Sequence, residues 1–331
     1  MKRKSVIEIM DTTLRDGEQT NGVSFVPHEK LSIARMLLRD LHADRIEVAS
    51  ARVSEGEKDS VKSICRWARQ AGMLDRVEVL GFVDGTTSID WLNDCGCRTL
   101  NLLCKGSERH LKYQLKKTLA EHIADIRRSV EYATKCGITV NIYLEDWSNG
   151  MKDSPEYVQG LVQNIISTPL TKEGTEVVSR FMLPDTLGIL NPDQVFAYVS
   201  QMVEWFPTLH FDFHAHNDYD LAVANVLAAV KAGCRGVHTS INGLGERAGN
   251  APLASVQAAL RDHLGIATSI QEDKLNDAAR LVESFSGIAV PPNKPIVGES
   301  VFTQVAGVHA DGDNNNNLYC NDLLPERFGK L

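Results

Sequence analysis

Two histidines, His214 and His216, follow the apolar run 209–213. Side chains two residues apart on a β-strand point to the same side, so this spacing aims two imidazoles in one direction at a strand tip. Neutral imidazole is a common ligand of divalent metals, and two such groups make half of a typical site. The pair therefore predicts a metal site that needs ligands from elsewhere in the chain.

A second group of reactive side chains lies near the N-terminus. A strand-like run, residues 6–10, leads into the segment 11–19, Asp-Thr-Thr-Leu-Arg-Asp-Gly-Glu-Gln, which contains Arg15 and Asp16. Two imidazoles and a carboxylate, with positions left open for a substrate, describe a catalytic metal site better than a structural one. Mixed nitrogen and oxygen ligands suit zinc, manganese, cobalt or magnesium, and the sequence does not choose among them.

The elements that must bring these groups together form an alternating pattern. Each strand-like run is followed by a stretch with helical spacing, which predicts a parallel sheet, and eight such units predict a TIM (β/α)8 barrel. An open doubly wound sheet is the alternative, but no G-x-G-x-x-G follows the first strand. The runs are 6–10, 45–49, 77–83, 99–103, 138–144, 177–183, 209–213 and 236–241, and the helical stretches are 27–41, 57–71, 87–94, 117–136, 155–167, 192–205, 219–232 and 252–264.

Closure of the barrel makes the first, seventh and eighth strands neighbours. Asp16, His214 and His216 can then meet at the carboxyl ends of the strands, where TIM-barrel enzymes carry their active sites. Other polar side chains fall at the same predicted rim, among them Glu145 after the fifth strand and Thr186 after the sixth. We therefore expect residues 1–267 to form a catalytic barrel domain.

The remaining segment, residues 268–331, differs in composition. A helix is predicted over 272–286, followed by a segment rich in proline and glycine and by the asparagine run 314–317, which is typical of a solvated loop. The segment is too short for a separate core. We expect a C-terminal helical and loop extension that packs on the barrel or on a neighbouring subunit.

Composition excludes several classes of protein. The 331 residues are 43% hydrophobic with a net charge of -8, which argues against binding nucleic acid or an anionic membrane. The sequence has no apolar run of membrane-spanning length and no signal-peptide core, so we expect a cytoplasmic protein. Its seven cysteines are scattered without a C-x-x-C pair, and Cys95-Gly-Cys97 lacks a partner pair, so reduced structural thiols are expected.

Three separated motifs resemble those of the DRE-TIM metallolyase family. They are the segment 11–19, the pair His214 and His216, and residues 243–250, Gly-Leu-Gly-Glu-Arg-Ala-Gly-Asn. The resemblance is to the branch that condenses acetyl-CoA with 2-oxo acids, which includes isopropylmalate, homocitrate and citramalate synthases. It continues into residues 307–312, Gly-Val-His-Ala-Asp-Gly.

The resemblance implies a homodimeric enzyme with acetyl-CoA as co-substrate, and a role for each matching residue. Asp16, His214, His216 and Asn250 would bind the metal, Arg15 the oxygen on which charge develops, and Thr186 the substrate carboxylate, while Glu145 would lie near the acetyl methyl group and His309 would reach into a partner's active site.

The chemistry of these residue types agrees with that reaction. A metal and Arg15 can stabilise the alkoxide formed when an acetyl-CoA enolate attacks a ketone. Glu145 is the first candidate for the base that removes the methyl proton, and His309 is the second. The alternatives are that Glu145 is a rim carboxylate in a salt bridge and that His309 is a loop histidine without a role.

Three residues near the ends of the third to fifth strands bear on the substrate. Leu80, Leu103 and Tyr143 would face its side group, and together they predict a small apolar pocket that suits the methyl group of pyruvate. The predicted product is citramalate, in branched-chain amino acid (isoleucine or leucine) biosynthesis. 2-Isopropylmalate synthesis from 2-oxoisovalerate is the alternative, and these residues could also do no more than pack the top of the barrel.

Two other hypotheses about the function agree with the same residues. An acyl-CoA lyase or aldolase of the same superfamily shares the barrel and the histidine pair, although residues 243–250 and His309 favour condensation. A barrel that binds metal without catalysis is the other. Members of the condensing branch often carry a C-terminal regulatory domain, and feedback control cannot be read from these residues.

Overall fold

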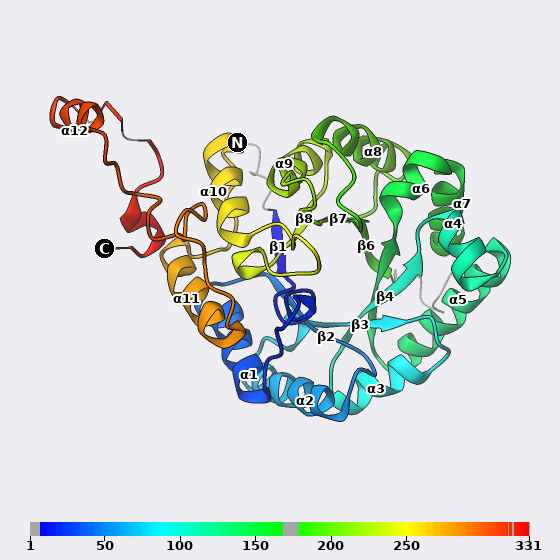
Figure 1. Ribbon diagram of the computed structural model, residues 1–331. Helices are drawn as coiled ribbons and strands as arrows, with labels where there is room; N and C mark the ends of the chain where they lie inside the picture. Colours follow the sequence, from blue (N-terminus) through cyan, green and yellow to red (C-terminus); the bar gives the residue numbers. More distant parts are fainter. Residues whose placement is uncertain (1–6, 168–177, 317, 320, 331) are drawn as a thin grey trace, which may run out of the picture.

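The computed structural model describes residues 7–167, 178–316, 318, 319 and 321–330. Within this part of the chain, eight parallel strands close into a barrel surrounded by helices, so the predicted TIM barrel is confirmed (Figure 1). The predictions for residues 6, 177, 317 and Cys320 lie outside the described residues. The strands are β1 (Glu8–Asp11), β2 (Arg45–Ser50), β3 (Val77–Phe82), β4 (Thr99–Lys105), β5 (Thr139–Glu145), β6 (Val178–Asp185), β7 (Phe211–Ala215) and β8 (Gly236–Thr239).

The helices form the outer layer of the barrel, mostly where helical spacing predicted them. The helices are α1 (Pro27–Arg35), α2 (Glu55–Gln70), α3 (Thr87–Cys95), α4 (Glu108–His110), α5 (Leu119–Lys135), α6 (Trp147–Asp153), α7 (Pro155–Ile166), α8 (Pro192–Trp205), α9 (Ala222–Ala232), α10 (Leu253–Leu264), α11 (Leu275–Ser286) and α12 (Gly307–Asn314). Single 3₁₀ turns at Gly17–Gln19, Leu74–Arg76, Ile241–Gly243, Glu272–Lys274 and Pro325–Phe328, and π-helical turns at Met36–Asp40 and Leu111–Leu115, complete the list.

Local sequence explains where several helices begin and end. The side chain of Asn191 accepts a hydrogen bond from the backbone of Gln194 at the start of α8, with Pro192 in the first turn. Gly96 and Gly233 end α3 and α9 in the left-handed region, as expected for a glycine after a helix. Helices α4, α6 and α12 were not predicted, because each is too short to give a periodic apolar pattern.

Barrel closure fixes which strands are neighbours. β1 pairs with β8, with Asp11 opposite Thr239, and β7 pairs with β8, with His214 opposite His238. The strand order therefore brings the N-terminal motif beside the histidine pair, as predicted.

The seventh strand extends further than its apolar run. Phe211 and Phe213 pack in the core between the barrel and its helices. Because side chains alternate along a strand, Asp212 and His214 point to the barrel interior. His214 thus lies within β7, and His216 follows directly after it.

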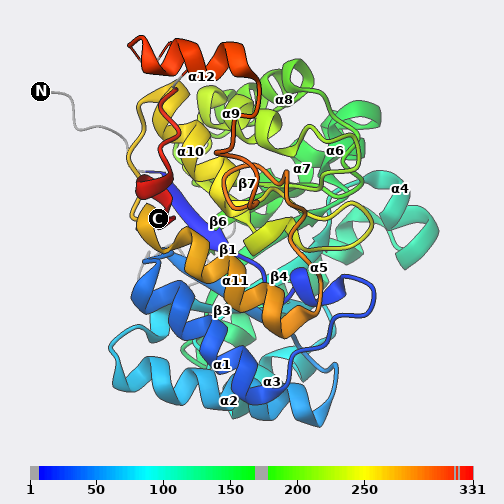
Figure 2. The same cartoon turned by 60° about the vertical axis from the view of Figure 1, so that its left-hand side comes forward.

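The C-terminal segment has one part packed on the barrel and one part that projects from it. α11 contacts α1, and Phe328 is buried with its ring stacked on that of Phe302. α12 lies at the end of an arm that extends away from the barrel, which is clearest in Figure 1 and is seen from another side in Figure 2. The division at residues 267 and 268 stays a prediction. No helix in the described ranges has both the length and the apolar content to cross a membrane.

Candidate active site

A cavity of about 220 Å³ opens at the carboxyl ends of the strands. All of the residues predicted for the site except Asn250 and His309 line it. Its lining comprises Arg15, Asp16, Gln19, Ser50, Leu80, Phe82, Leu103, Tyr143, Glu145, Pro184, Thr186, His214, His216 and Glu246. Residues from almost every strand end, far apart in the sequence, therefore face one space.

The loop after β1 is held by backbone and side-chain hydrogen bonds. The Thr12 amide donates to the Thr239 carbonyl at 2.8 Å, and the Ile241 amide donates to the Thr13 hydroxyl at 2.8 Å. The buried ammonium of Lys30 pairs with Glu18 at 2.6 Å and with Glu57 at 2.5 Å. These contacts tie the loop to β8 and the first helices, so that the residues between Thr13 and Glu18 have a fixed position.

Arg15 is fixed in the cavity by two carboxylates. Its Nε donates to Glu47 at 2.6 Å, and its guanidinium also pairs with Asp16. Burial lowers the pKa of Arg15, but the charges of Asp16 and Glu47 outweigh that effect and raise it overall. Asn101 donates to the other oxygen of Glu47 at 2.7 Å. The result is a permanent, oriented cation beside the strand ends.

The predicted metal ligands Asp16, His214 and His216 lie close together. The Nε2 of His214 is 3.5 Å from Oδ2 of Asp16, and the ring centroids of His214 and His216 are 5.1 Å apart. Burial lowers the pKa of both histidines, that of His214 to well below its ordinary value. Both rings are therefore neutral, which is the form that binds metals.

These ligands fit a cation because buried polar atoms among them have no other partner. Among the described residues, Oδ2 of Asp16, Nδ1 of His216 and both amide atoms of Asn250 are buried without a hydrogen-bond partner. No group of three or more histidine, cysteine, aspartate or glutamate side chains in the described ranges is already arranged around one metal position. The four-residue ligand set therefore stays a proposal, supported by unpaired atoms that a cation would satisfy.

Asn250 is brought to the site by the loop after β8. Residues His216 and Asn250 form an isolated antiparallel bridge, and the Asn217 amide donates to the Gly249 carbonyl at 2.8 Å. Gly249 has a φ of 84°, and a Cβ at this position would overlap the carbonyl oxygen of Gly243. The loop thus needs glycine here to place Asn250 beside the histidine pair, although Asn250 does not line the cavity.

Glu145 and Thr186 both line the cavity and both have partners. Glu145 pairs with Lys105, so the salt bridge considered as the alternative does occur. The hydroxyl of Thr186 accepts a hydrogen bond from the Asp146 amide at 2.9 Å and keeps its own proton available to a ligand. Neither contact removes these residues from the cavity.

The three residues predicted to face the substrate side group form part of a separate apolar cluster. Met10, Leu80, Tyr143 and Met182 are buried together, with Leu103 packed against them. This cluster is distinct from the core between barrel and helices and lies under the cavity. The Tyr143 hydroxyl is 3.4 Å from Nη2 of Arg15, so the apolar floor adjoins the fixed cation.

His309 lies outside this cavity. It is part of α12 on the projecting arm, where its ring lies 4.3 Å from that of Tyr319, measured between centroids. A role within the same chain's cavity is not supported by this position. Its predicted role in a partner subunit stays a prediction.

Two buried residues next to the site were missed by sequence reasoning. Glu47 on β2 holds Arg15, and His238 on β8 contacts both Tyr143 and His214. Each is a charged or polar residue buried within a largely apolar strand. That feature was readable in the sequence, since such a side chain must find a partner when buried.

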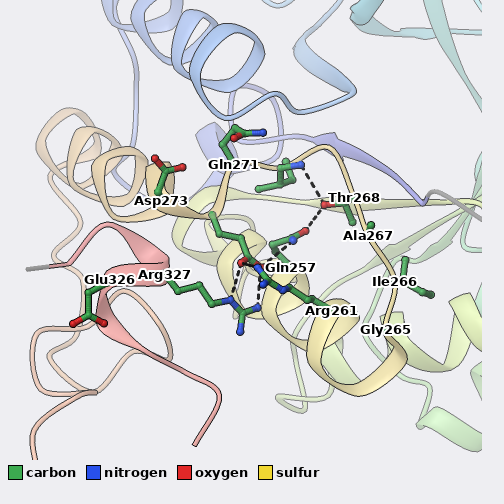
Figure 3. A pocket seen from close by; sticks show the side chains of 12 residues that line it. Gln257, Arg261, Gly265, Ile266, Ala267, Thr268, Gln271, Asp273, Glu326 and Arg327 are labelled. Atoms are coloured by element: carbon green, nitrogen blue, oxygen red, sulfur yellow. Dashed lines mark hydrogen bonds and ion pairs between the residues drawn. The ribbon is translucent and has the colours of Figure 1, made fainter. Parts of the chain in front are cut away.

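A larger cavity, about 670 Å³, lies elsewhere, between α10, the segment before α11 and the C-terminal turn (Figure 3). Arg327 donates to Glu272 at 2.7 and 2.8 Å, and Gln257 donates to Glu272 at 3.1 Å. These contacts satisfy Glu272, and among the described residues that line this cavity no side-chain atom is both buried and unpaired. This cavity therefore lacks the unpaired polar atoms that distinguish the barrel site.

A model of the HMGL-like family matches residues 6–282, which covers all eight strands and the active-site cavity. The chain belongs to the HMGL-like family. The resemblance drawn from the three sequence motifs is thereby confirmed.

Two relatives of this HMGL-like chain illustrate the branch. A protein of Ignicoccus hospitalis named probable 2-isopropylmalate synthase is 36% identical over 98% of the chain and 77% of its own length. A protein of Methanocaldococcus jannaschii named (R)-citramalate synthase is also 36% identical, over 98% of the chain and 62% of its own length. The chain thus spans less than two thirds of the second relative. Both are named as synthases, in agreement with the predicted enzyme class, and the equal identities favour neither substrate.

Solved structures agree on the fold. The HMG-CoA lyase of Bacillus subtilis superposes with a TM-score of 0.72 at 23% identity, covering 88% of this chain and 97% of that one. At this identity the likeness supports the barrel architecture of the HMGL-like chain and not a shared reaction.

Proposed function

We propose that this protein catalyses the metal-dependent condensation of acetyl-CoA with a small 2-oxo acid. The observation that carries the proposal is the cavity in which the Arg15 cation adjoins the histidine pair and the unpaired buried atoms Oδ2 of Asp16 and Nδ1 of His216. The relatives named as isopropylmalate and citramalate synthases support the same reaction class.

Asp16, His214, His216 and Asn250 would hold a divalent cation: zinc, manganese, cobalt or magnesium. When bound, such a cation supplies Lewis-acid polarisation of the ketone and orients the oxo acid. Nε2 of His214 lies 3.5 Å from Oδ2 of Asp16, so both atoms could bind the same cation.

The proposed reaction consists of a proton transfer, the formation of a carbon–carbon bond and the hydrolysis of a thioester. A base removes a proton from the acetyl methyl group, the methyl carbon bonds to the ketone carbon, and the ketone oxygen gains a proton. Water then cleaves the thioester C–S bond and releases CoA. Arg15, held by Glu47 and Asp16, is oriented in advance to stabilise the negative charge on the ketone oxygen, and Thr186 would bind the substrate carboxylate.

Glu145 is our first candidate for the base and His309 of a partner subunit the second. Glu145 lines the cavity, and its carboxylate is engaged by the ammonium of Lys105 in a salt bridge. Binding of acetyl-CoA would have to loosen this pair if Glu145 takes the proton.

We propose pyruvate as the oxo acid, giving citramalate. The apolar floor of Leu80, Leu103 and Tyr143 suits a methyl group and offers no partner to a second carboxylate. 2-Oxoisovalerate, giving 2-isopropylmalate, is the alternative, and a relative of the same identity is named for that reaction. Values of kcat/KM for pyruvate, 2-oxobutyrate, 2-oxoisovalerate and 2-oxoglutarate decide between them, and a preference for any oxo acid other than pyruvate contradicts this assignment.

A free-thiol assay tests the reaction class. CoA should appear only when acetyl-CoA, an oxo acid and a divalent metal are all present. Release of acetyl-CoA or an aldehyde from a 3-hydroxyacyl-CoA or a 4-hydroxy-2-oxo acid would instead indicate the lyase or aldolase alternative. Metal binding without turnover of any of these compounds would indicate a non-catalytic barrel.

We further propose that the protein is a homodimer in which the α12 arm crosses to a partner. Val305 and Leu318, on either side of α12, are 93% and 67% exposed. Apolar side chains on a projecting arm are typical of a surface that another subunit covers.

A further inference from the structure

A continuous series of buried polar contacts leads from the cavity into the barrel. The Nδ1 of His214 is 3.2 Å from Nδ1 of His238, and the Nε2 of His238 is 3.2 Å from Oδ2 of Asp212. Asp212 is fully buried and pairs with Arg45 and, at 3.4 Å, with Arg180. None of these three residues, His238, Asp212 or Arg45, was assigned a role above.

The charges around Asp212 determine the proton position on His238. A carboxylate between two guanidinium groups is ionised and can only accept hydrogen bonds. The Nε2 of His238 must therefore carry the proton that it donates to Asp212. In a neutral imidazole this leaves Nδ1 of His238 without a proton.

The contact with Tyr143 is compatible with the same state. The Tyr143 hydroxyl lies 2.9 Å from Nδ1 of His238, and its oxygen faces Nη2 of Arg15 at 3.4 Å. A guanidinium only donates, so the tyrosine oxygen accepts from Arg15 and its own proton can point to His238. The one lone pair of Nδ1 on His238 is then shared between the Tyr143 hydroxyl and the facing ring nitrogen of His214.

The state of His238 in turn fixes the state of His214. Two facing ring nitrogens 3.2 Å apart hold one proton between them, because two protons would clash and none would leave two lone pairs opposed. Since Nδ1 of His238 is bare, the proton belongs to Nδ1 of His214. The Nε2 of His214 then presents a lone pair toward Oδ2 of Asp16.

We propose that His238, oriented by Asp212, is a positioning residue that holds His214 in the tautomer with a free Nε2 and so prepares it to bind the metal. The inference rests on the proposed function only in taking Nε2 of His214 as a metal ligand. Two acceptor atoms, Nε2 of His214 and Oδ2 of Asp16, then face each other at 3.5 Å. A cation between them would stabilise this arrangement.

The tautomer is measured directly on the metal-free protein labelled with ¹⁵N-histidine, with the His214 signals assigned from the spectrum of His214→Gln. The expected result is a protonated Nδ1 and an unprotonated Nε2. A proton on Nε2 of His214 in the wild-type protein would overturn the proposal.

Metal affinity provides the second readout, with the dissociation constant for Zn²⁺ or Mn²⁺ measured by competition with a chelator. His238→Leu should weaken binding by about 10–100-fold, the usual effect of losing such a partner. His238→Asn, which can place an amide oxygen where Nδ1 lies, should recover part of the loss. Wild-type affinity in His238→Leu would contradict the proposal.

His210→Gln is the matched control. His210 contacts the same carboxylate at 3.0 Å but approaches it from the partly exposed end of the barrel. Its loss should change metal affinity by no more than about twofold. An equal loss in His210→Gln and His238→Leu would indicate a general effect of the ion network and would refute the specific role. Neither measurement uses substrate, so failure of the condensation reaction is distinguishable from failure of this inference.

Discussion

At the residue scale, the site depends on side chains that are buried and held before any ligand arrives. Arg15 has carboxylates on two sides, and Asp16 retains one oxygen without a hydrogen-bond partner in the described part of the chain. Burial makes such an unpaired carboxylate oxygen costly, by several kcal/mol, unless a cation satisfies it. The unpaired atom is therefore a stronger indication of a metal than the residue types alone.

Replacing Asp16 should remove metal binding and activity together. Asp16→Asn keeps the shape but loses the negative charge that offsets both Arg15 and the metal. We expect metal content after dialysis to fall below about a tenth of the wild-type value, with a parallel loss in kcat, because even the loss of a residue that only contacts a ligand weakens metal binding about 10–100-fold. Near-normal metal content in a folded Asp16→Asn protein would show that Asp16 is not a ligand.

The size of Tyr143 should control the choice of oxo acid. Tyr143→Ser removes the ring from the apolar cluster under the cavity and should raise kcat/KM for 2-oxoisovalerate relative to pyruvate by about 10–100-fold. Tyr143→Phe is the matched control, because it keeps the ring and removes only the hydroxyl that contacts His238. The preference of Tyr143→Phe should stay within about threefold of the wild type. An unchanged ratio in Tyr143→Ser means that the ring does not limit the substrate.

At the element scale, the barrel strands carry the chemistry at their ends while the helices hold those ends in place. α5 is an example, because Nε2 of its His122 accepts a hydrogen bond from the backbone amide of Lys105 at 3.1 Å. That contact fixes the end of β4 next to the Lys105–Glu145 pair. It requires His122 to be unprotonated at Nε2.

This contact gives a prediction about pH and stability. Burial lowers the pKa of His122 to about 4 in the folded protein, whereas the same ring in an unfolded chain takes up a proton below about pH 6.5. Between these two pH values, protonation of His122 therefore favours the unfolded state. The stability contributed is complete above pH 6.5 and is lost as the pH falls toward 4, by roughly 2–3 kcal/mol. The difference in unfolding free energy between wild type and His122→Gln, from urea titrations at several pH values, should shrink over this range. A difference that does not vary with pH would rule out a buried neutral His122.

At the scale of the whole molecule, the C-terminal arm bears on whether two subunits share each active site. α12 lies on an arm away from the barrel (Figure 1). His309 is part of α12 and does not line the cavity of its own chain, so a catalytic role needs a second subunit. In a dimer with two-fold symmetry each arm would complete the opposite site.

Mixing two inactive variants tests that arrangement. Asp16→Asn and His309→Ala disable different halves of the site, so a mixed dimer would contain one site in which both residues are native. Co-refolded or co-expressed subunits should recover about one quarter of wild-type activity, since about half of the dimers are mixed. Recovery no greater than the sum of the separate variants, with dimers verified by light scattering, would exclude a shared site.

The amino-acid pattern alone was enough to predict the architecture and to name most of the residues of the site. Strand-like runs and stretches with helical spacing can be told apart because their apolar residues repeat with different periods, and eight alternating pairs predict a parallel barrel. Closure of that barrel then predicts that Asp16 lies near His214. The spacing of His214 and His216 was sufficient to place both on one side of β7, since side chains alternate along a strand. The same alternation predicts that Asp212 points into the barrel. It does not predict which residue Asp212 contacts, because the partner lies on another strand.

The partners of the buried charged and polar side chains could be identified only from the folded structure. Glu47 holds Arg15, and Asp212 reaches His238, through pairs that are 32 and 26 residues apart in the sequence. Such pairings follow from barrel closure and strand register, and no local pattern encodes them. The direction of the α12 arm was likewise undetermined by sequence, because a short helix with two glycines has weak intrinsic preferences and takes its position from what it packs against.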